Sequence, residues 1–329
     1  MKPEATRTRT RIRTVVRRCC ASLAMFLLAG AACDRRSSDS PDGTHARRTV
    51  GVSLLTMQHQ FYQELRAGLE SASKGRDLRL ILVSAEFDSA RQANQIDEFI
   101  VQKVDAIVVC PCDSRSVGAG IAAANQANIP VFTADIANHS PLGRVVSHIA
   151  SDNVQGGREA ARLMAEALDE KGTVAILSHP EVASVSDRVR GFKEELAGFA
   201  GLRLVAELSA EGKRDKAVRV MEDLLQSHPD LSGVFAINDD TALGALAAIE
   251  AAGKAASSPA NAATKGIQIV GYDATPEVRA KIATRAIYGD VIQNPRQIGE
   301  LTIGAVHDHL SGRKPPPLIP VAVGTYVGR

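Results

Sequence analysis

Tryptophan is absent from this chain, and the other aromatic residues are scarce. Eight Phe and four Tyr make up 4% of its 329 residues, so any aromatic surface must be built from these two residue types. Cysteine is also rare, at five residues, and two of these, Cys19 and Cys20, lie in the N-terminal segment. The body therefore does not depend on disulfides, and at about 280 residues it is long enough to bury a sufficient core without them.

Long hydrophobic runs are missing as well. The apolar run from Ala21 to Ala32 is shorter than the ~20 residues that span a bilayer. The apolar fraction of 45% and the charged fraction of 23% are ordinary for a soluble globular protein. Together they exclude a disordered chain, a collagen and a polytopic membrane protein, and the length predicts two domains.

Sequence motifs of catalysis are not found. The chain contains no G-x-S-x-G elbow, no Walker loop and no G-x-G-x-x-G turn. His307 and His309 are two apart on a helical pattern, so their side chains diverge and do not chelate one metal. His59 is the lone candidate base, and a hydrogen-bonding ligand contact or an ordinary loop residue explains it better. We expect no enzyme, no cofactor and no metal.

The charge is unevenly distributed along the chain. Residues 1–33 carry a net charge of +6, which leaves −4 for the remainder because the whole chain carries +2. A mildly acidic body has no electrostatic footprint for nucleic acid.

The N-terminus has the pattern of an export signal, predicted over residues 1–33. Basic residues ending in Arg17-Arg18 precede the apolar run, and small residues follow it. Ala29-x-Ala31 suits ordinary signal peptidase, whereas the stretch up to Cys33 resembles a bacterial lipoprotein signal in which the cysteine is acylated. In the second case Asp34 resembles an inner-membrane retention signal. A twin-arginine signal is a weaker alternative, and the polar residues 34–48 are predicted to form a flexible tether.

Cys110 and Cys112 are separated only by a proline. Two residues apart on an extended segment, their Cα atoms lie roughly 6.5 Å apart, near the limit for a disulfide. We interpret them as small buried residues at a strand end, with a disulfide or metal pair as the alternative.

From Val50 onward, short β-rich runs alternate with amphipathic helical patterns, which is typical of βαβ units and a parallel sheet. About ten such strands are too many for one open sheet. The sequence therefore predicts an α/β fold of two doubly wound lobes, and a (β/α)8 barrel is the alternative. Residues 257–264 are predicted to be a surface insertion. The predicted strands are Val50–Leu55, Leu78–Val83, Ala106–Val109, Val131–Ala134, Arg144–His148, Thr173–Leu177, Leu202–Leu208, Gly233–Ala236, Ile267–Gly271 and Ala286–Ile292. The predicted helices are Phe61–Lys74, Ala90–Val104, Val154–Leu168, Asp187–Leu196, Lys213–Leu225 and Thr241–Ala252.

In doubly wound lobes, ligands bind at the carboxyl ends of the strands. Aromatic, carboxylate, amide and guanidinium groups gather at these ends in the sequence, and this set suits a polyhydroxylated ligand. Carboxylates and amides exchange hydrogen bonds with hydroxyls, and aromatic rings pack on the C–H faces of a sugar. For Asp135, Asp239 and Asp273 the alternative is a helix N-cap, for Phe61 a core residue, and for Arg188 a solvated charge.

The body resembles bacterial periplasmic sugar-binding proteins of the ribose/galactose type over residues 50–323. These proteins are receptors of ABC importers and structural relatives of the LacI repressor core. The ribose-binding branch is the most similar. The stretches that carry the resemblance are Ala124–Val131, Val145–Asn153 with Gly156-Gly157, Arg188–Phe192, Val234–Asp239 with Ala242–Ala245, Val270–Pro276, and Ile292-Gln293 with Gln297–Gly299.

The resemblance implies a set of ligand-binding residues. They are His59, Phe61, Tyr62, Asp135, Arg188, Asn238, Tyr272, Asp273 and Gln293. Three positions depart from the ribose branch: Ile136 replaces an Arg, His59 an Asn, and Gly212 an aromatic residue. These departures predict a differently shaped pocket, so a sugar or sugar-like ligand is better supported than ribose.

The resemblance also implies two lobes joined by three crossovers, near Ala150-Ser151, Gln293-Asn294 and Pro320. The N-terminal lobe is predicted over residues 49–150 and 294–320, and the C-terminal lobe over 151–293 and 321–329. Closure of the hinge would bury the ligand and present the closed, monomeric protein to a permease and its ATPase in the periplasm.

Two other functions share this core. A repressor would need a helix-turn-helix where this chain carries a signal and a tether. A periplasmic sensor that presents a sugar or small signal to a chemoreceptor or histidine kinase is the alternative to import, because both depend on lobe closure.

Overall fold

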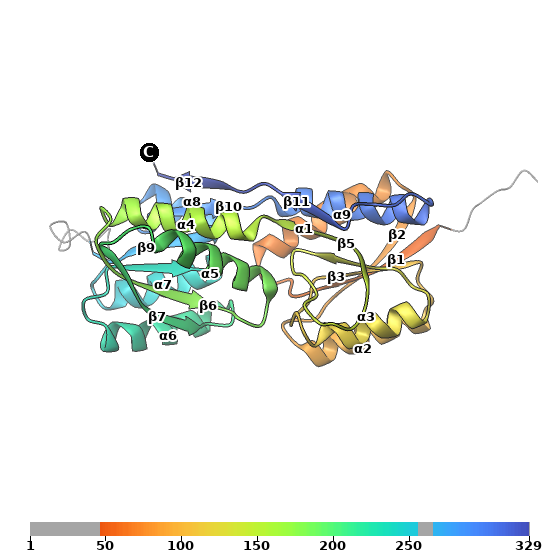
Figure 1. Ribbon diagram of the computed structural model, residues 1–329, viewed down its shortest axis with the longest axis horizontal. Helices are drawn as coiled ribbons and strands as arrows, with labels where there is room; N and C mark the ends of the chain where they lie inside the picture. The colour runs from red at the N-terminus through yellow and green to blue at the C-terminus, as the bar shows by residue number, and fades with distance from the viewer. Residues whose placement is uncertain (1–46, 256–265, 329) are drawn as a thin grey trace, which may run out of the picture. The chain divides into compact units, whose positions relative to one another are not determined.

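The computed structural model describes residues 47–255 and 266–328, which belong to one compact unit (Figure 1). The predicted signal at residues 1–33 with Cys33, nearly all of the tether, and the insertion at 257–264 lie outside the described residues. The strand β1 begins at Arg48, the last residue of the expected tether.

Strands and helices alternate along the chain as the hydrophobic pattern predicts, and they form two six-stranded sheets. The first has the order β11-β5-β4-β3-β1-β2 and is parallel throughout. Its strands are β1 (Arg48–Leu54), β2 (Leu78–Ser84), β3 (Ala106–Val109), β4 (Val131–Ala134), β5 (Val145–Ser151) and β11 (Leu318–Val321).

The second sheet has the order β12-β10-β9-β8-β6-β7 and is parallel except for β12, which pairs antiparallel with β10. Its strands are β6 (Gly172–Ser178), β7 (Leu202–Ser209), β8 (Gly233–Ala236), β9 (Gln268–Asp273), β10 (Gly289–Ile292) and β12 (Gly324–Val327). Two open sheets confirm the two-lobed fold and exclude the single barrel.

Helices cover both faces of each sheet, because alternate residues of the buried strands enter different hydrophobic clusters. In β6, for example, Val174 packs in one cluster and Ala175 in another. The first sheet packs against the pair α1 (Gln60–Lys74) and α9 (Pro295–Leu310) and the pair α2 (Ser89–Val101) and α3 (Val117–Gln126). The second packs against α4 (Asn153–Ala167), α5 (Ala183–Leu196), α6 (Arg214–Ser227), α7 (Asp239–Ala251) and α8 (Pro276–Ala283).

The chain passes three times between the sheets: after β5, after β10 and between β11 and β12. These passages bring the carboxyl ends of strands from both lobes to the same region of the molecule.

Several element boundaries differ from the sequence prediction. Helix α5 begins at Ala183, four residues before the predicted start at Asp187, so Arg188 lies within the helix. Strand β10 begins at Gly289 and not at Ala286. Ala286 lies in the bend that connects α8 to β10. The predicted strands and helices do not include α3, α8, α9, β11 and β12; the helical pattern noted at His307 and His309 lies in α9.

Candidate ligand-binding site

A small cavity lies between the two lobes and is lined by groups from both. Eight of the nine predicted ligand-binding residues contribute to its wall. They are His59, Phe61, Tyr62, Asp135, Arg188, Asn238, Asp273 and Gln293. The residues predicted from the strand ends therefore meet at one cavity, although they are up to 234 residues apart in the sequence.

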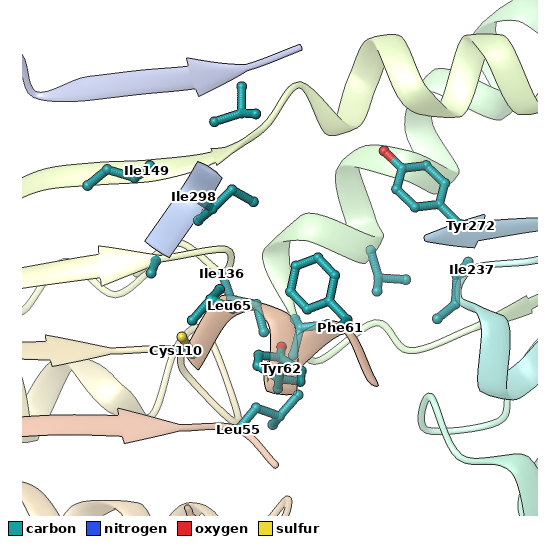
Figure 2. Close-up of a cluster of buried hydrophobic side chains, with 14 of the residues drawn as sticks. Leu55, Phe61, Tyr62, Leu65, Cys110, Ile136, Ile149, Ile237, Tyr272 and Ile298 are labelled. Carbon is teal, nitrogen blue, oxygen red and sulfur yellow. The ribbon is translucent and has the colours of Figure 1, made fainter. Parts of the chain in front are cut away.

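Phe61 and Tyr62 lie in the first turn of α1 and are almost completely buried. Their rings pack edge to face at 5.1 Å, as Figure 2 shows at the start of this helix. The Tyr62 hydroxyl donates a hydrogen bond of 2.8 Å to Oδ2 of Asp135. The ring of Tyr62 thus forms part of the cavity wall, and its hydroxyl is the hydrogen-bond partner of the buried Asp135 carboxyl.

Asp135 follows β4 in a left-handed backbone conformation, with a φ of 65°. Its Oδ1 is buried and has no hydrogen-bond partner among the described residues. Burial raises the pKa of Asp135, and the nearby Arg188 guanidinium opposes that rise. The carboxyl therefore has one oxygen bonded to Tyr62 and a second oxygen that can accept a hydrogen bond from a ligand.

Arg188 is held rigidly by the second lobe. Its Nε donates to Oδ1 of Asn153 at 2.8 Å, and its Nη1 donates to the carbonyl of Ile237 at 2.7 Å. The guanidinium carbon lies 3.9 Å from the centre of the Tyr272 ring. Because Arg188 is buried in α5, the solvated-charge alternative is wrong.

Tyr272 is the predicted site residue that does not line the cavity. It is fully buried on β9, and its hydroxyl lies 3.4 Å from Oδ1 of Asn153 (Figure 2). Its ring supports the Arg188 guanidinium from behind, so it positions a cavity residue.

Asn238 is the N-cap of α7 and forms a capping box with Thr241. Its Oδ1 accepts from the Thr241 amide at 2.9 Å, and its Nδ2 donates to the Gly212 carbonyl at 3.1 Å. Since a primary amide carries two N–H groups, one donor of Asn238 remains for the cavity.

Asp273 and Gln293 form a pair at the ends of β9 and β10. The Gln293 amide donates to Oδ1 of Asp273 at 2.6 Å, while its own Oε1 is buried without a partner among the described residues. Burial, and then the charge of Asp239, raise the pKa of Asp273 well above its ordinary value. The N-cap of α8 is Thr275, and α7 is capped by Asn238, so the helix-cap interpretation of Asp135, Asp239 and Asp273 is wrong.

His59 closes the cavity from the first lobe. Its Nε2 lies 3.3 Å from Oδ2 of Asp240 in the second lobe. Burial lowers the pKa of His59, although the Asp240 carboxylate acts in the opposite direction. The approach of His59 to Asp240 brings polar groups of the two lobes together at the cavity wall.

The sequence prediction missed part of the wall. Phe87 and His179 line the cavity from the loops after β2 and β6, and the same strand-end rule, applied to these two strands, would have found them. Ile136 and Gly212, two of the three noted departures, also line it. The remaining lining residues are Leu55, Val182, Ser184, Val185 and Ile237.

Cys110 and Cys112 are both free and buried, as the interpretation of small residues at a strand end predicts. No cluster of three or more His, Cys, Asp or Glu side chains within residues 47–255 and 266–328 is arranged to hold a metal ion. Over the same part of the chain, no helix has the length and apolar character needed to cross a membrane.

Fold and site together define a two-lobed binding protein, in which hydrogen-bonding groups from both α/β lobes converge on one small cavity. The family model of the periplasmic binding protein domain matches residues 50–314, and the chain belongs to this family.

Two similar relatives are themselves import or binding proteins. The ribose import binding protein of Bacillus subtilis (strain 168) is 34% identical over 296 residues, which cover 89% of this chain and 92% of that protein. The xylitol-binding protein of Mycolicibacterium smegmatis is 31% identical, over 75% of this chain and 68% of that protein.

A similar solved structure is also that of a solute-binding protein. The ABC transporter solute-binding protein from Agrobacterium vitis, bound with α-D-tagatopyranose, is 27% identical, with a TM-score of 0.79 over 85% of this chain and 94% of that one. The chain is therefore a solute-binding protein and not an enzyme, and its location is periplasmic or extracellular.

Proposed function

We propose that this protein is the solute-binding component of an ABC importer and that it holds a monosaccharide or sugar-like ligand in the cavity between its lobes. The ligand contacts are the eight lining residues named above, and Tyr272 supports them from behind. The relatives named for ribose and xylitol, and the structure bound with a tagatopyranose, support this ligand class.

One observation carries the proposal. Asp135 Oδ1 in the first lobe and Gln293 Oε1 at the end of β10 are buried acceptors without partners among the described residues, and both side chains line the same cavity. An unsatisfied buried acceptor costs about 1–3 kcal/mol. A ligand with several hydroxyl donors would satisfy both at once.

The charges of the cavity favour a neutral ligand. Two carboxyl groups, Asp135 and Asp273, face it together with a single guanidinium, Arg188. A sugar acid would bring its own carboxylate into a buried site whose one guanidinium, Arg188, already donates to Asn153 and Ile237. We therefore expect neutral sugars or polyols to bind in preference to sugar acids.

The proposal extends to how the protein works. The lobes, residues 49–150 with 294–320 and residues 151–293 with 321–329, would close about the three passages of the chain. The closed monomer would then dock on a permease that works with an ATPase. Residues 1–33 would direct export, and acylation of Cys33 would anchor the protein to the inner membrane.

Thermal unfolding against a ligand panel tests the function. The chain from Asp34 onward would be heated with pentoses, hexoses, polyols and sugar acids. A ligand bound only by the folded state adds about 2.7 kcal/mol of stability at a hundredfold excess over its dissociation constant. A clear shift with a neutral sugar or polyol supports the proposal, whereas a shift with sugar acids alone, or with no member of the panel, contradicts it.

Truncation of either cavity carboxylate tests the site. We expect Asp135→Ala and Asp273→Ala each to weaken ligand binding by about 1 kcal/mol or more, because each removes a hydrogen-bonding partner of the ligand. Isothermal titration calorimetry measures the loss. Asp215→Ala is the matched control, since that carboxylate is exposed on α6. Wild-type affinity in both cavity variants would show that the site is assigned wrongly.

A further inference from the structure

Phe87 links the two lobes at the wall of the cavity. It lies in the loop between β2 and α2, and its ring meets the His59 ring of the same lobe at 5.2 Å, edge to face. On the other lobe, the His179 ring lies 6.4 Å away, and Nζ of Lys213 lies 4.7 Å from the centre of the Phe87 ring. Phe87 is therefore the centre of a small aromatic group that spans both lobes.

The backbone that carries Phe87 is strained. Glu86 and Phe87 both have a positive φ, of 52° and 63°, which is uncommon for residues other than glycine, asparagine and aspartate. Such strain persists only where the surroundings hold it, and it is concentrated at functional sites.

Glu86 supplies the bonds that hold this turn. Its carboxylate accepts from Thr56 Oγ1 at 2.8 Å, from the Met57 amide at 3.1 Å and from Gln58 Nε2 at 2.9 Å. The Phe87 amide also donates to the Leu55 carbonyl at 3.0 Å. The turn is thus tied to the loop between β1 and α1, which carries His59 and leads into α1, the helix of Phe61.

The facing wall of the second lobe lacks a side chain at Gly212. This residue lines the cavity with a φ of 65°, and a Cβ there would lie 3.3 Å from Nδ1 of His179 and 3.4 Å from Nδ2 of Asn238. A bulky residue at this position would be both strained and crowded. His179 neighbours both Gly212 and Phe87, so these three residues belong to the same part of the cavity wall.

We propose that Phe87 is a specificity-determining residue whose ring packs on the C–H face of a cyclic sugar when the lobes are closed. The assignment rests on the proposed function and names the ligand class more closely. A flat aromatic ring complements the flat C–H face of a ring sugar, which an acyclic polyol does not present in one fixed conformation. His59 and His179 extend the wall as neutral rings, because burial lowers the pKa of both.

Substitutions that separate aromatic from merely apolar character test the assignment. Calorimetry would measure the binding of D-ribose, D-allose, D-tagatose and myo-inositol to the wild type and to Phe87→Tyr, Phe87→Leu and Phe87→Ala, with xylitol measured by competition. For the cyclic ligand that the wild type binds best, we expect at least a fivefold loss in the Leu and Ala variants and less than a twofold change in the Tyr variant. Affinity for xylitol should stay within twofold throughout.

Two controls accompany the series. Phe199→Leu makes the same replacement at an aromatic residue outside the cavity and should leave the affinity unchanged. The unfolding midpoint of each unliganded variant shows whether it is folded. Wild-type affinity in Phe87→Leu, or an equal loss for cyclic sugars and xylitol, would overturn the assignment. A wild type that binds no member of the panel would overturn the proposed function, and the assignment with it.

Discussion

At the scale of single residues, the most unusual feature is a pair of buried carboxyl groups behind the site. Asp290 on β10 is fully buried, and neither of its oxygens has a conventional donor among the described residues. Oδ2 of Asp239 at the start of α7 accepts from the Thr275 amide at 2.6 Å, and the Asp239 and Asp290 carboxyl groups lie close enough to influence each other's pKa. Burial raises the pKa of Asp239 to about 6 and that of Asp290 well above its ordinary value. We infer that the two carboxyl groups share a proton, which would give each of them a hydrogen-bond partner.

This pair makes a pH-dependent contribution to stability. Both pKa values are higher in the folded state, so the folded protein keeps protons that the unfolded chain has lost above about pH 4. The contribution is complete below the unfolded pKa and is lost as the pH rises through the folded values. The buried histidines, with lowered pKa values, act in the opposite direction, so a variant must be compared with the wild type at each pH.

The Asp290→Asn variant removes the pH-dependent contribution of this pair. Its side-chain amide can donate a hydrogen bond to Asp239 but does not titrate. We expect the variant to be more stable than the wild type at pH 8 by at least about 1 kcal/mol, the scale of one pKa unit. The difference should be smaller at pH 5. Urea unfolding at both pH values measures it, and a difference that does not change with pH would contradict the shared proton.

At the scale of elements, glycines allow helices that carry site residues to pack with their backbones in contact. A Cβ at Gly299 of α9 would lie 2.4 Å from the Leu65 carbonyl of α1, the helix that presents Phe61. A Cβ at Gly191 of α5 would lie 2.0 Å from the Val154 carbonyl of α4. A backbone carbonyl cannot rotate away as a side chain can, so these contacts set how closely each pair of helices packs.

Two alanine substitutions in the same helix test this packing. Gly299→Ala should lower the free energy of unfolding by about 1–3 kcal/mol, because a Cβ is forced against backbone. Gly304→Ala, also in α9, meets only the end of the Arg76 side chain at 3.9 Å and should raise it by roughly 0.5–1 kcal/mol, as alanine favours a helix interior. Urea unfolding measures both, and a neutral Gly299→Ala would show that the helices can move apart freely.

At the scale of the whole molecule, the lobes meet through direct hydrogen bonds as well as through the cavity. The Ser114 amide of the first lobe donates to the Glu181 carbonyl of the second at 3.0 Å. The Ala183 amide donates to Ser114 Oγ at 2.9 Å. With the approach of His59 Nε2 to Asp240 Oδ2 at 3.3 Å, these contacts favour the closed arrangement, and the measured affinity of a ligand includes them.

Ser114→Ala should weaken ligand binding about fivefold, because closure would bury the Ala183 amide without its acceptor. The stability of the unliganded protein should change little if its lobes are open. Calorimetry measures the affinity, and Ser186→Ala is the control, since that hydroxyl bonds only within the second lobe. Unchanged binding in Ser114→Ala would show that this contact plays no part in closure.

Much of the fold and site could be predicted from local sequence patterns. Alternating strands and helices indicate two doubly wound lobes, and the carboxyl ends of parallel strands then place Asp135, Asn238 and Asp273 together. These inferences succeed because hydrophobic periodicity is a local property of the chain and because parallel strands of one sheet end at the same edge.

What only the tertiary structure decided is how side chains pair within that frame. Tyr62 and Asp135 are 73 residues apart, and Tyr272 supports Arg188 and does not face the cavity. The strained turn at Phe87 has no glycine or asparagine to mark it in the sequence. Such pairings depend on distances between segments remote in the chain, and those distances are set by packing and not by local residue preference.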